Sequence, residues 1–309
     1  MNIIFMGTPA FAVPSLERLH ESRHKVVLVV TQPDKPSGRG KKLKKSEVKE
    51  KAEELGLEIF QPDKIKNEEN IEVLKSYKPD AIVVVAYGQI LSKDILNLPR
   101  LGCINVHASL LPKLRGAAPI NWAIINGETK TGITTMLMDE GLDTGDMLLK
   151  TEVEIDENMN VGDLHDILMH KGADLLLETL EKLEKNELSP QKQDDSLSSY
   201  APMINKEDRK IKWKLTAKDI HNLIRGLSPW PTAYFTMDED TVKVYKASYI
   251  NDDSDYQPGY VIKANKDGIF VKAGEGAVIL KEIQMPGKNK MPVEAFLRGN
   301  KFPEKIMLE

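Results

Sequence analysis

The stretch Leu101-Gly-Cys-Ile-Asn-Val-His-Ala-Ser-Leu-Leu-Pro112 organises the chain, because within it a strand pattern runs directly into a proline-containing loop. Ile104 and Val106 alternate with the more polar Asn105 and His107. Successive side chains of a strand point to opposite faces, so Asn105 and His107 share one face, about 6.5 Å apart along the strand. Strand ends that feed loops hold the functional groups of open α/β sheets. The stretch therefore predicts a site that combines an amide with an imidazole.

Apolar runs and helical patterns alternate on the N-terminal side of this stretch. Residues 2–6, 25–31 and 81–86 are near-continuous apolar runs, which are typical of parallel strands covered on both faces. Helical patterns over 46–55 and 67–76 lie between these runs. The alternation predicts an α/β fold with a Rossmann-like, doubly wound parallel sheet.

The turn after the first strand argues against a dinucleotide cofactor. A Rossmann-type pyrophosphate site uses G-x-G-x-x-G, whose glycines let the backbone approach the phosphates. The corresponding turn here, Gly7-Thr-Pro-Ala-Phe-Ala12, has one glycine and a proline in place of that pattern. NAD binding is therefore disfavoured.

On the C-terminal side, the pattern predicts a further strand over 131–138 and a long amphipathic helix over 161–183. Between them, residues 139–146 hold two glycines and three aspartates, which indicates a loop. The plain interpretation is an acidic surface turn; a metal site is weaker, because the spacing does not match a calcium loop. Residues 186–199 are polar without periodicity and read as a linker or an extended connection.

In the last third of the chain, the predicted secondary structure changes from alternating strands and helices to mainly short strands. A helix is expected over 216–227, followed by short strands separated by turn signals, which favours a small OB-like β-barrel. The expected strands cover 232–237, 242–250, 259–264, 269–273 and 277–285. We therefore expect a Rossmann-like catalytic domain over 1–189, a linker over 190–205 and an OB-like barrel domain over 206–309.

Composition excludes several classes of protein. The 309 residues include no apolar run long enough to cross a membrane, and the N-terminus lacks the basic region of a signal peptide. A single cysteine, Cys103, excludes an internal disulfide and a cysteine zinc cluster, and it is expected to be a buried hydrophobe. These features predict a cytoplasmic protein.

A basic segment interrupts an otherwise slightly acidic chain. The formal net charge of −4 argues against non-specific coating of nucleic acid, but a local patch at Lys35-Pro-Ser-Gly-Arg-Gly-Lys-Lys-Leu-Lys-Lys45 can still attract phosphates. The bland interpretation is a solvated lysine-rich loop. Glycines on both sides of Arg39 instead suggest flexibility around a planar, multi-donor group that suits phosphates.

Two motifs together carry a family resemblance. Asn105-Val-His-Ala-Ser-Leu-Leu-Pro112, joined to Gly141-Leu-Asp-Thr-Gly-Asp146, closely resembles the 10-formyltetrahydrofolate-dependent formyltransferases. The resemblance covers nearly the whole chain, and the basic segment and second domain are most similar to members that act on tRNA. Further matching segments are Phe5–Pro9, Gly38–Lys42, Arg115–Pro119, Tyr200–Ile204, Ile211–Trp213, Gly226–Pro231 and Phe296–Gly299.

The resemblance implies an activity and three catalytic residues, Asn105, His107 and Asp143. The implied formyl donor is 10-formyltetrahydrofolate, used as a co-substrate without a metal. The implied acceptor is the α-amino group of methionine on initiator tRNA, and the product begins bacterial-type translation. A monomer is expected.

The resemblance also implies binding residues for both substrates. Ser109, Leu110, Leu111 and Pro112 are expected to line the folate site. The segment Val85–Leu91, with Tyr87 and Gly88, is expected to form another wall through its backbone, although Tyr87-Gly88 also reads as a simple strand-terminating turn. In the resembling enzymes the basic segment enters the acceptor stem, so Arg39 is expected to contact tRNA, with Lys41 and Lys42 on phosphates. We also expect this loop to be disordered until tRNA binds.

These residue types suit formyl transfer. Asn105 can donate a hydrogen bond to the oxyanion that forms when an amine attacks an amide-like carbonyl, and a protonated His107 can donate a second. A histidine–carboxylate pair can also move protons between the amine and the leaving nitrogen, with Asp143 orienting the imidazole, supporting its charge or relaying a proton through water.

Two alternatives remain open from the sequence. A formyltransferase acting on a small amine would need neither the basic segment nor an RNA-facing barrel. A folate- or RNA-binding module without catalysis would not need the intact constellation of Asn105, His107 and Asp143.

Overall fold

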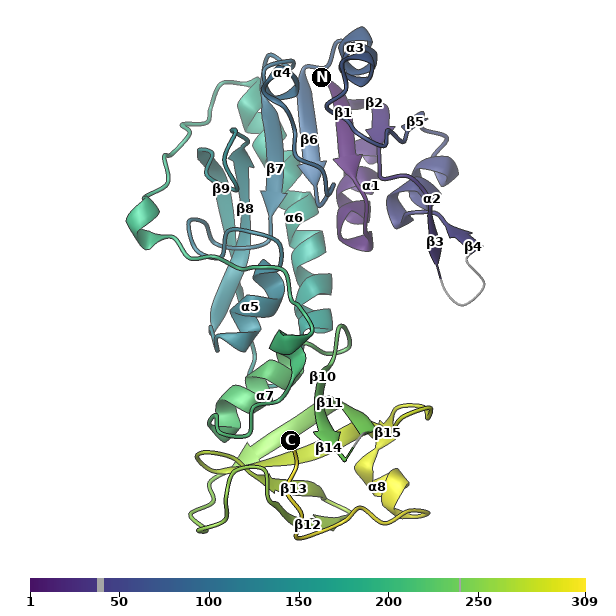
Figure 1. The fold of residues 1–309 in the computed structure, drawn as a ribbon. Helices are drawn as coiled ribbons and strands as arrows, with labels where there is room; N and C mark the ends of the chain where they lie inside the picture. Colours follow the sequence, from purple (N-terminus) through teal and green to yellow (C-terminus); the bar gives the residue numbers. More distant parts are fainter. Residues whose placement is uncertain (38–41, 239) are drawn as a thin grey trace. The chain divides into compact units, whose positions relative to one another are not determined.

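The computed structural model describes residues 1–37, 42–238 and 240–309, and within them the chain forms two compact units (Figure 1). Unit 1 consists of Met1–Gly116, Thr131–Val153 and His165–Tyr200. Unit 2 consists of Ala117–Lys130, Glu154–Leu164 and Ala201–Glu309. The segment expected as a linker therefore divides, with 190–200 in unit 1 and 201–205 in unit 2.

Unit 1 is built on a seven-stranded sheet with the order β5-β2-β1-β6-β7-β8-β9 (Figure 1). The strands are β1 (Asn2–Gly7), β2 (Lys25–Val30), β5 (Ile59–Phe60), β6 (Ala81–Val85), β7 (Cys103–His107), β8 (Lys130–Leu137) and β9 (Met147–Glu154). The strands from β5 to β7 pair in parallel, and β8 runs antiparallel to β7. The predicted α/β fold with a mostly parallel sheet is confirmed.

The winding of the sheet reverses between β1 and β6. From β1 the chain winds outward through β2 to β5, and it then returns to β6 and continues through β7 on the other side. Such a reversal leaves a crevice at the carboxyl ends of the two central strands, where open α/β sheets bind ligands. Thr8, after β1, donates its hydroxyl to the carbonyl oxygen of Tyr87, after β6, at 2.9 Å. This bond joins the two loops at the reversal point.

Apolar runs explain why these strands are central. Residues 3–6 of β1 are completely buried, as are 81–83 and Val85 of β6. Gly7 ends β1 where the chain turns back tightly, because a Cβ there would lie 2.8 Å from the Cβ of Ala12 and 3.1 Å from the carbonyl oxygen of Val85. The single glycine of this turn is thus required by close packing.

The helices predicted over 46–55, 67–76 and 161–183 are confirmed as α2 (Glu47–Glu54), α3 (Glu68–Ser76) and α6 (Val161–Glu184), and most of α6 belongs to unit 1. Unit 1 also contains α1 (Val13–Glu21), α4 (Lys93–Leu96) and 3₁₀ turns at Ala10–Ala12 and Asp195–Leu197. The basic segment differs from a simple loop, because its flanks pair as a two-stranded antiparallel ribbon of β3 (Lys35–Ser37) and β4 (Lys42–Lys44).

The strand β9 and the helix α5 (Pro119–Ile125) were not predicted from the sequence either. The edge strand β9 follows the glycine-rich loop, and α5 follows the central stretch. β9 does show a period of two, since Lys150, Glu152 and Glu154 are exposed while Val153 is buried. α5 carries Pro119 in its first turn, a position that proline favours.

Unit 2 contains an antiparallel sheet with the order β10-β11-β14-β13-β12, and β15 pairs with β14. Its elements are α5, α7 (Ala217–Gly226), β10 (Ala233–Met237), β11 (Asp240–Ile250), β12 (Val261–Asn265), β13 (Gly268–Lys272), β14 (Ala277–Gln284), β15 (Met291–Pro292), α8 (Val293–Leu297) and a 3₁₀ turn at Glu207–Arg209. One buried apolar cluster, including Ile220, Phe235 and Leu280, joins α7 to the sheet. The prediction of a second, antiparallel β-rich domain is confirmed.

No helix within the described ranges is both long enough and apolar enough to cross a membrane.

Candidate active site

Strand β7 places Asn105 and His107 at the carboxyl end of the parallel sheet. Asn105 lies opposite Met136 of β8, and His107, the last residue of β7, lies opposite Thr134. The two side chains are two residues apart and therefore share a face. Asn105 is half-buried, and its side-chain amide makes no hydrogen bond to the residues that the structure describes. The amide is thus free to donate to a substrate.

His107 is buried and faces oxygen atoms with both of its ring nitrogens. Nε2 lies 3.0 Å from the carbonyl oxygen of Leu114, and Nδ1 lies 3.6 Å from Oδ2 of Asp143. A carbonyl oxygen can only accept, so Nε2 carries a hydrogen in this arrangement. In a neutral ring Nδ1 is then the nitrogen with the lone pair, and it points toward the carboxylate.

Asp143 lies in the loop between β8 and β9 and is held by the backbone. Its Oδ2 accepts a hydrogen bond from the N–H of Gly116 at 2.8 Å, and its side chain is 11% exposed. Its φ of 54° lies in the left-handed region, which aspartate tolerates better than most residues. The structure therefore brings His107 and Asp143 together, with Asn105 two residues before the histidine.

Glycine is required beside Asp143. A Cβ at Gly145 would lie 1.8 Å from the carbonyl oxygen of Leu137, so the loop can pass the end of β8 only without a side chain there. On the other side of the loop, the hydroxyl of Thr144 donates to the carboxylate of Asp139 at 2.8 Å. These contacts explain the local sequence Asp-Thr-Gly after Leu142.

The loop after β7 is fixed from within the protein. Ser109 is completely buried and donates its hydroxyl to the carbonyl oxygen of Lys113 at 2.6 Å. The hydroxyl of Thr134 donates to the carbonyl oxygen of Ser109 at 2.7 Å and accepts from the N–H of Leu111 at 3.1 Å. From β9, the Nζ of Lys150 donates to the carbonyl oxygen of Leu111 at 2.6 Å.

Burial separates the four loop residues expected to bind folate into two groups. The side chains of Ser109 and Leu111 are committed to the protein interior, whereas Leu110 and Pro112 are half-buried. Only the latter two present side chains toward the surface.

Tyr87 and Gly88 follow β6 at the reversal point of the sheet. The side chain of Tyr87 is 2% exposed and belongs to an apolar cluster of unit 1, where burial raises the pKa of its hydroxyl. Its carbonyl oxygen accepts from Thr8 and, at 3.2 Å, from the side-chain amide of Gln32. The tyrosine ring is therefore a core group. Gly88 is exposed, with a φ of 88°.

The residues expected to contact tRNA are only partly described. Arg39 and Lys41 lie outside the described residues, as does the expected disorder of their loop, and Lys42 begins β4. Farther along the segment, Lys44 pairs with Glu47 at 2.7 Å and Lys45 with Glu53 at 2.6 Å, which connects the ribbon to α2.

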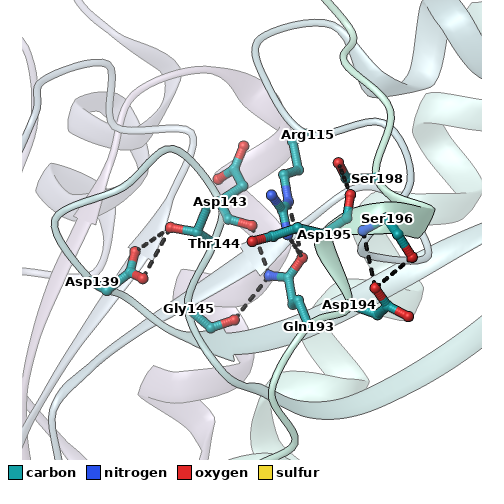
Figure 2. A network of polar contacts seen from close by, with 10 residues as sticks. All are labelled: Arg115, Asp139, Asp143, Thr144, Gly145, Gln193, Asp194, Asp195, Ser196 and Ser198. Atoms are coloured by element: carbon teal, nitrogen blue, oxygen red, sulfur yellow. Dashed lines mark hydrogen bonds and ion pairs between the residues drawn. The ribbon is translucent and has the colours of Figure 1, made fainter.

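Sequence analysis missed a second group of residues around Asp143 (Figure 2). Arg115, which follows the loop after β7, donates from Nε and Nη2 to Oε1 of Gln193 at 3.0 and 2.8 Å. Gln193 in turn donates to the backbone of the Asp143 loop. Gln193 lies in the polar segment that the sequence presents as a linker, and its only signal there is a high content of side chains that can form hydrogen bonds.

Comparison with known proteins identifies the family. Residues 1–180 match the family described as formyl transferase, and residues 203–301 match the formyl transferase C-terminal domain. The fold is also that of an N-formyltransferase from Helicobacter canadensis solved with folinic acid and dTDP-3-aminofucose, with a TM-score of 0.67 at 21% identity, over 92% of this chain and 98% of that one. The class of protein is therefore a formyltransferase.

More similar relatives narrow the class. The methionyl-tRNA formyltransferase of Clostridium novyi (strain NT) is 54% identical over 310 residues, covering 100% of both chains. That of Clostridium perfringens (strain 13 / Type A) is 54% identical over 301 residues, covering 97% of both chains. This chain belongs to the formyl transferase family and, within it, to the methionyl-tRNA formyltransferases.

Proposed function

We propose that this chain transfers the formyl group of 10-formyltetrahydrofolate to the α-amino group of methionyl initiator tRNA, with Asn105, His107 and Asp143 as catalytic residues. The formylmethionyl-tRNA that results serves translation initiation. The observation that carries the assignment of residues is the amide of Asn105, which has no partner in the described protein and shares a strand face with a histidine directed at a carboxylate.

Asn105 has the position and chemistry of an oxyanion donor. The reaction forms a bond between the amine nitrogen and the formyl carbon and breaks the bond from that carbon to N10 of the folate. Negative charge gathers on the formyl oxygen between these two events. An amide N–H aimed at that oxygen stabilises the charge, and the loss of one such donor typically costs about 10²–10³ in rate.

We assign the role of the base to His107. Because Nε2 donates to Leu114, Nδ1 of the neutral ring can take the proton that the attacking amine loses. Asp143, 3.6 Å away, then stabilises the imidazolium. The same imidazolium can return the proton to the departing N10, so the cycle leaves the histidine neutral and needs no other acid.

Folate contacts are proposed for the two loops at the carboxyl ends of β6 and β7. Leu110 and Pro112 offer apolar surface, and the backbone at exposed Gly88 offers polar groups. Ser109 and Leu111 would shape the loop from beneath, and Tyr87 would support the turn that carries Gly88. For tRNA, we propose Arg39 with Lys41 and Lys42, on the composition of the basic segment. The monomeric state and the cytoplasmic location stay predictions.

Formylation of methionyl initiator tRNA tests the proposal. The protein is incubated with 10-formyltetrahydrofolate and charged initiator tRNA, and formylmethionine is scored after deacylation. His107→Ala is expected to lower kcat by about 10²–10⁴, the range for removal of a general base. Wild-type kcat in this variant would overturn the mechanism. The small-amine alternative predicts that the protein does not shift initiator tRNA in a gel.

A further inference from the structure

We propose that Gln193 is a positioning residue that holds Asp143 in its catalytic geometry by connecting the Asp143 loop to Arg115. The inference rests on the proposed role of Asp143 in catalysis. It concerns a side chain that lies 50 residues along the chain from the aspartate and that belongs to no recognised motif of the sequence.

Gln193 uses all of its hydrogen-bonding capacity at this point (Figure 2). Its Nε2 donates to the carbonyl oxygen of Asp143 at 2.7 Å and to that of Gly145 at 2.9 Å. Its Oε1 accepts twice from the guanidinium of Arg115, at 3.0 and 2.8 Å. The carbonyls only accept and the guanidinium only donates, so the amide has one possible orientation.

The contacts form a closed ring around the aspartate. Gln193 holds the backbone of Asp143, and the N–H of Gly116, next to Arg115 in the chain, holds its carboxylate at 2.8 Å. Gln193 binds the turn at two carbonyl groups, that of Asp143 before Thr144 and that of Gly145 after it. Since Asp143 has a left-handed backbone, which costs a non-glycine residue about 1 kcal/mol or more, external contacts are needed to keep this conformation.

Gln193 is itself anchored on both sides. Before it, Gln191 pairs with Met147 of β9 through two backbone hydrogen bonds of 2.8 and 2.9 Å. After it, Ser199 accepts the N–H of Leu114 on its hydroxyl and the N–H of Arg115 on its carbonyl oxygen, both at 2.9 Å. Leu114 is the residue whose carbonyl orients His107. The segment therefore supports both members of the histidine–aspartate pair.

Gln193→Glu separates the two functions of the side-chain amide, accepting from Arg115 and donating to the Asp143 loop. Glutamate keeps an acceptor for Arg115 but cannot donate, and it places a carboxylate against the two carbonyls of the Asp143 loop. We expect kcat to fall by about 10- to 100-fold, the scale of a misplaced catalytic group, while KM for both substrates stays within about 3-fold. The matched control is Asp195→Asn, which removes the exposed ion pair to Arg115 at 2.8 Å but leaves Gln193 bonded, and we expect its kcat to stay within about 2-fold of wild type.

A double-mutant cycle tests whether Gln193 acts through Asp143. Asp143→Asn keeps the backbone carbonyl that Gln193 binds but removes the charge of the carboxylate. If Gln193 acts through that carboxylate, adding Gln193→Glu to Asp143→Asn lowers kcat by no more than about 2-fold further. Thermal unfolding of each variant identifies any general loss of structure, and a second substitution, Gln193→Met, removes the amide without adding charge.

The outcomes distinguish a failure of the proposed catalytic mechanism from a failure of the positioning role of Gln193. If Asp143→Asn retains wild-type kcat, the proposed mechanism fails. If Asp143→Asn is impaired but Gln193→Glu and Gln193→Met both keep wild-type kcat, only the positioning role fails. Losses that multiply in the double variant also overturn it, because they would assign Gln193 an effect independent of the aspartate.

Discussion

At the residue scale, the site separates groups that the protein has satisfied from groups that it leaves available. His107 Nε2, the carboxylate of Asp143 and the hydroxyl of Ser109 all have protein partners. The amide of Asn105 and Nδ1 of His107 have no hydrogen bond among the described residues. A buried or half-buried polar group without a partner costs stability, so its presence at a strand end marks where substrate is expected to bind.

Asn105 provides the first prediction at this scale. Asn105→Ala is expected to lower kcat by about 10²–10³, because the oxyanion loses a donor. Asn105→Asp keeps the size of the side chain but offers only acceptors, so its kcat is expected to be as low or lower. Formylation kinetics measure both. An Asn105→Asp variant with near wild-type kcat would contradict the oxyanion role.

Lys150 provides the second prediction. Lys150→Met removes the donor to the carbonyl oxygen of Leu111 and frees part of the loop proposed to contact folate. A lost hydrogen bond of about 1 kcal/mol corresponds to a rise in KM for the formyl donor of about 5-fold, with kcat little changed. Lys150→Arg retains a donor and serves as the control. A change in kcat alone would contradict the assignment.

At the scale of elements, the sequence was most informative where burial is continuous. The runs that form β1, β2 and β6 are predictable because a covered parallel strand needs apolar residues at nearly every position. The place of Asn105 and His107 on one strand face follows from the same local geometry. By contrast, β9 is an edge strand with charged residues on its exposed face. Its sequence therefore resembles a continuation of the polar loop that precedes it.

Contacts between distant segments could not be predicted from local patterns. Gln193 meets Asp143 because Gln191 pairs with Met147, and neither contact leaves a periodicity in the sequence. The same holds for the commitment of Ser109 to its own loop: family resemblance indicated that this residue lies near folate, but only the structure shows which of its atoms are already bonded.

The start of α7 provides the prediction at this scale. Thr216 caps the helix by accepting the N–H of Asp219 on its hydroxyl at 3.1 Å. Thr216→Ala is expected to lower the free energy of unfolding by about 1 kcal/mol, whereas Thr216→Ser keeps the hydroxyl and most of the stability. Urea unfolding followed by the fluorescence of buried Trp213 measures the difference. Equal stabilities for the two variants would rule out the cap.

At the scale of the whole molecule, each unit has its own core and a buried histidine whose pKa is lowered by burial, His24 in unit 1 and His221 in unit 2. In unit 2, burial and then the nearby charge of Arg225 lower the pKa of His221 to about 4. Its ring packs on Tyr249, whose hydroxyl donates to Glu157. The imidazole is therefore neutral in the folded unit at neutral pH.

This histidine predicts a loss of stability in mild acid. The unfolded chain takes up a proton on His221 below its ordinary pKa of about 6.5, while the folded unit resists protonation until about pH 4. The free energy of unfolding is thus expected to fall as pH drops from about 6.5 to 4, by at most about 3 kcal/mol for this group. Urea titrations at several pH values, read from Trp213, measure the slope. His221→Leu should flatten it; an unchanged slope in that variant would assign the effect to other groups.

The polar segment that carries Gln193 has a consequence for how the chain can vary. Both of its ends are tied to fixed points of unit 1, Gln191 to Met147 and Ser199 to Leu114 and Arg115. Connecting segments on protein surfaces normally gain and lose residues freely. Here an insertion or deletion between the two ties would carry the amide of Gln193 away from the aspartate. In natural chains that share this site, we therefore expect residues of this segment to be substituted while the length of the segment is conserved.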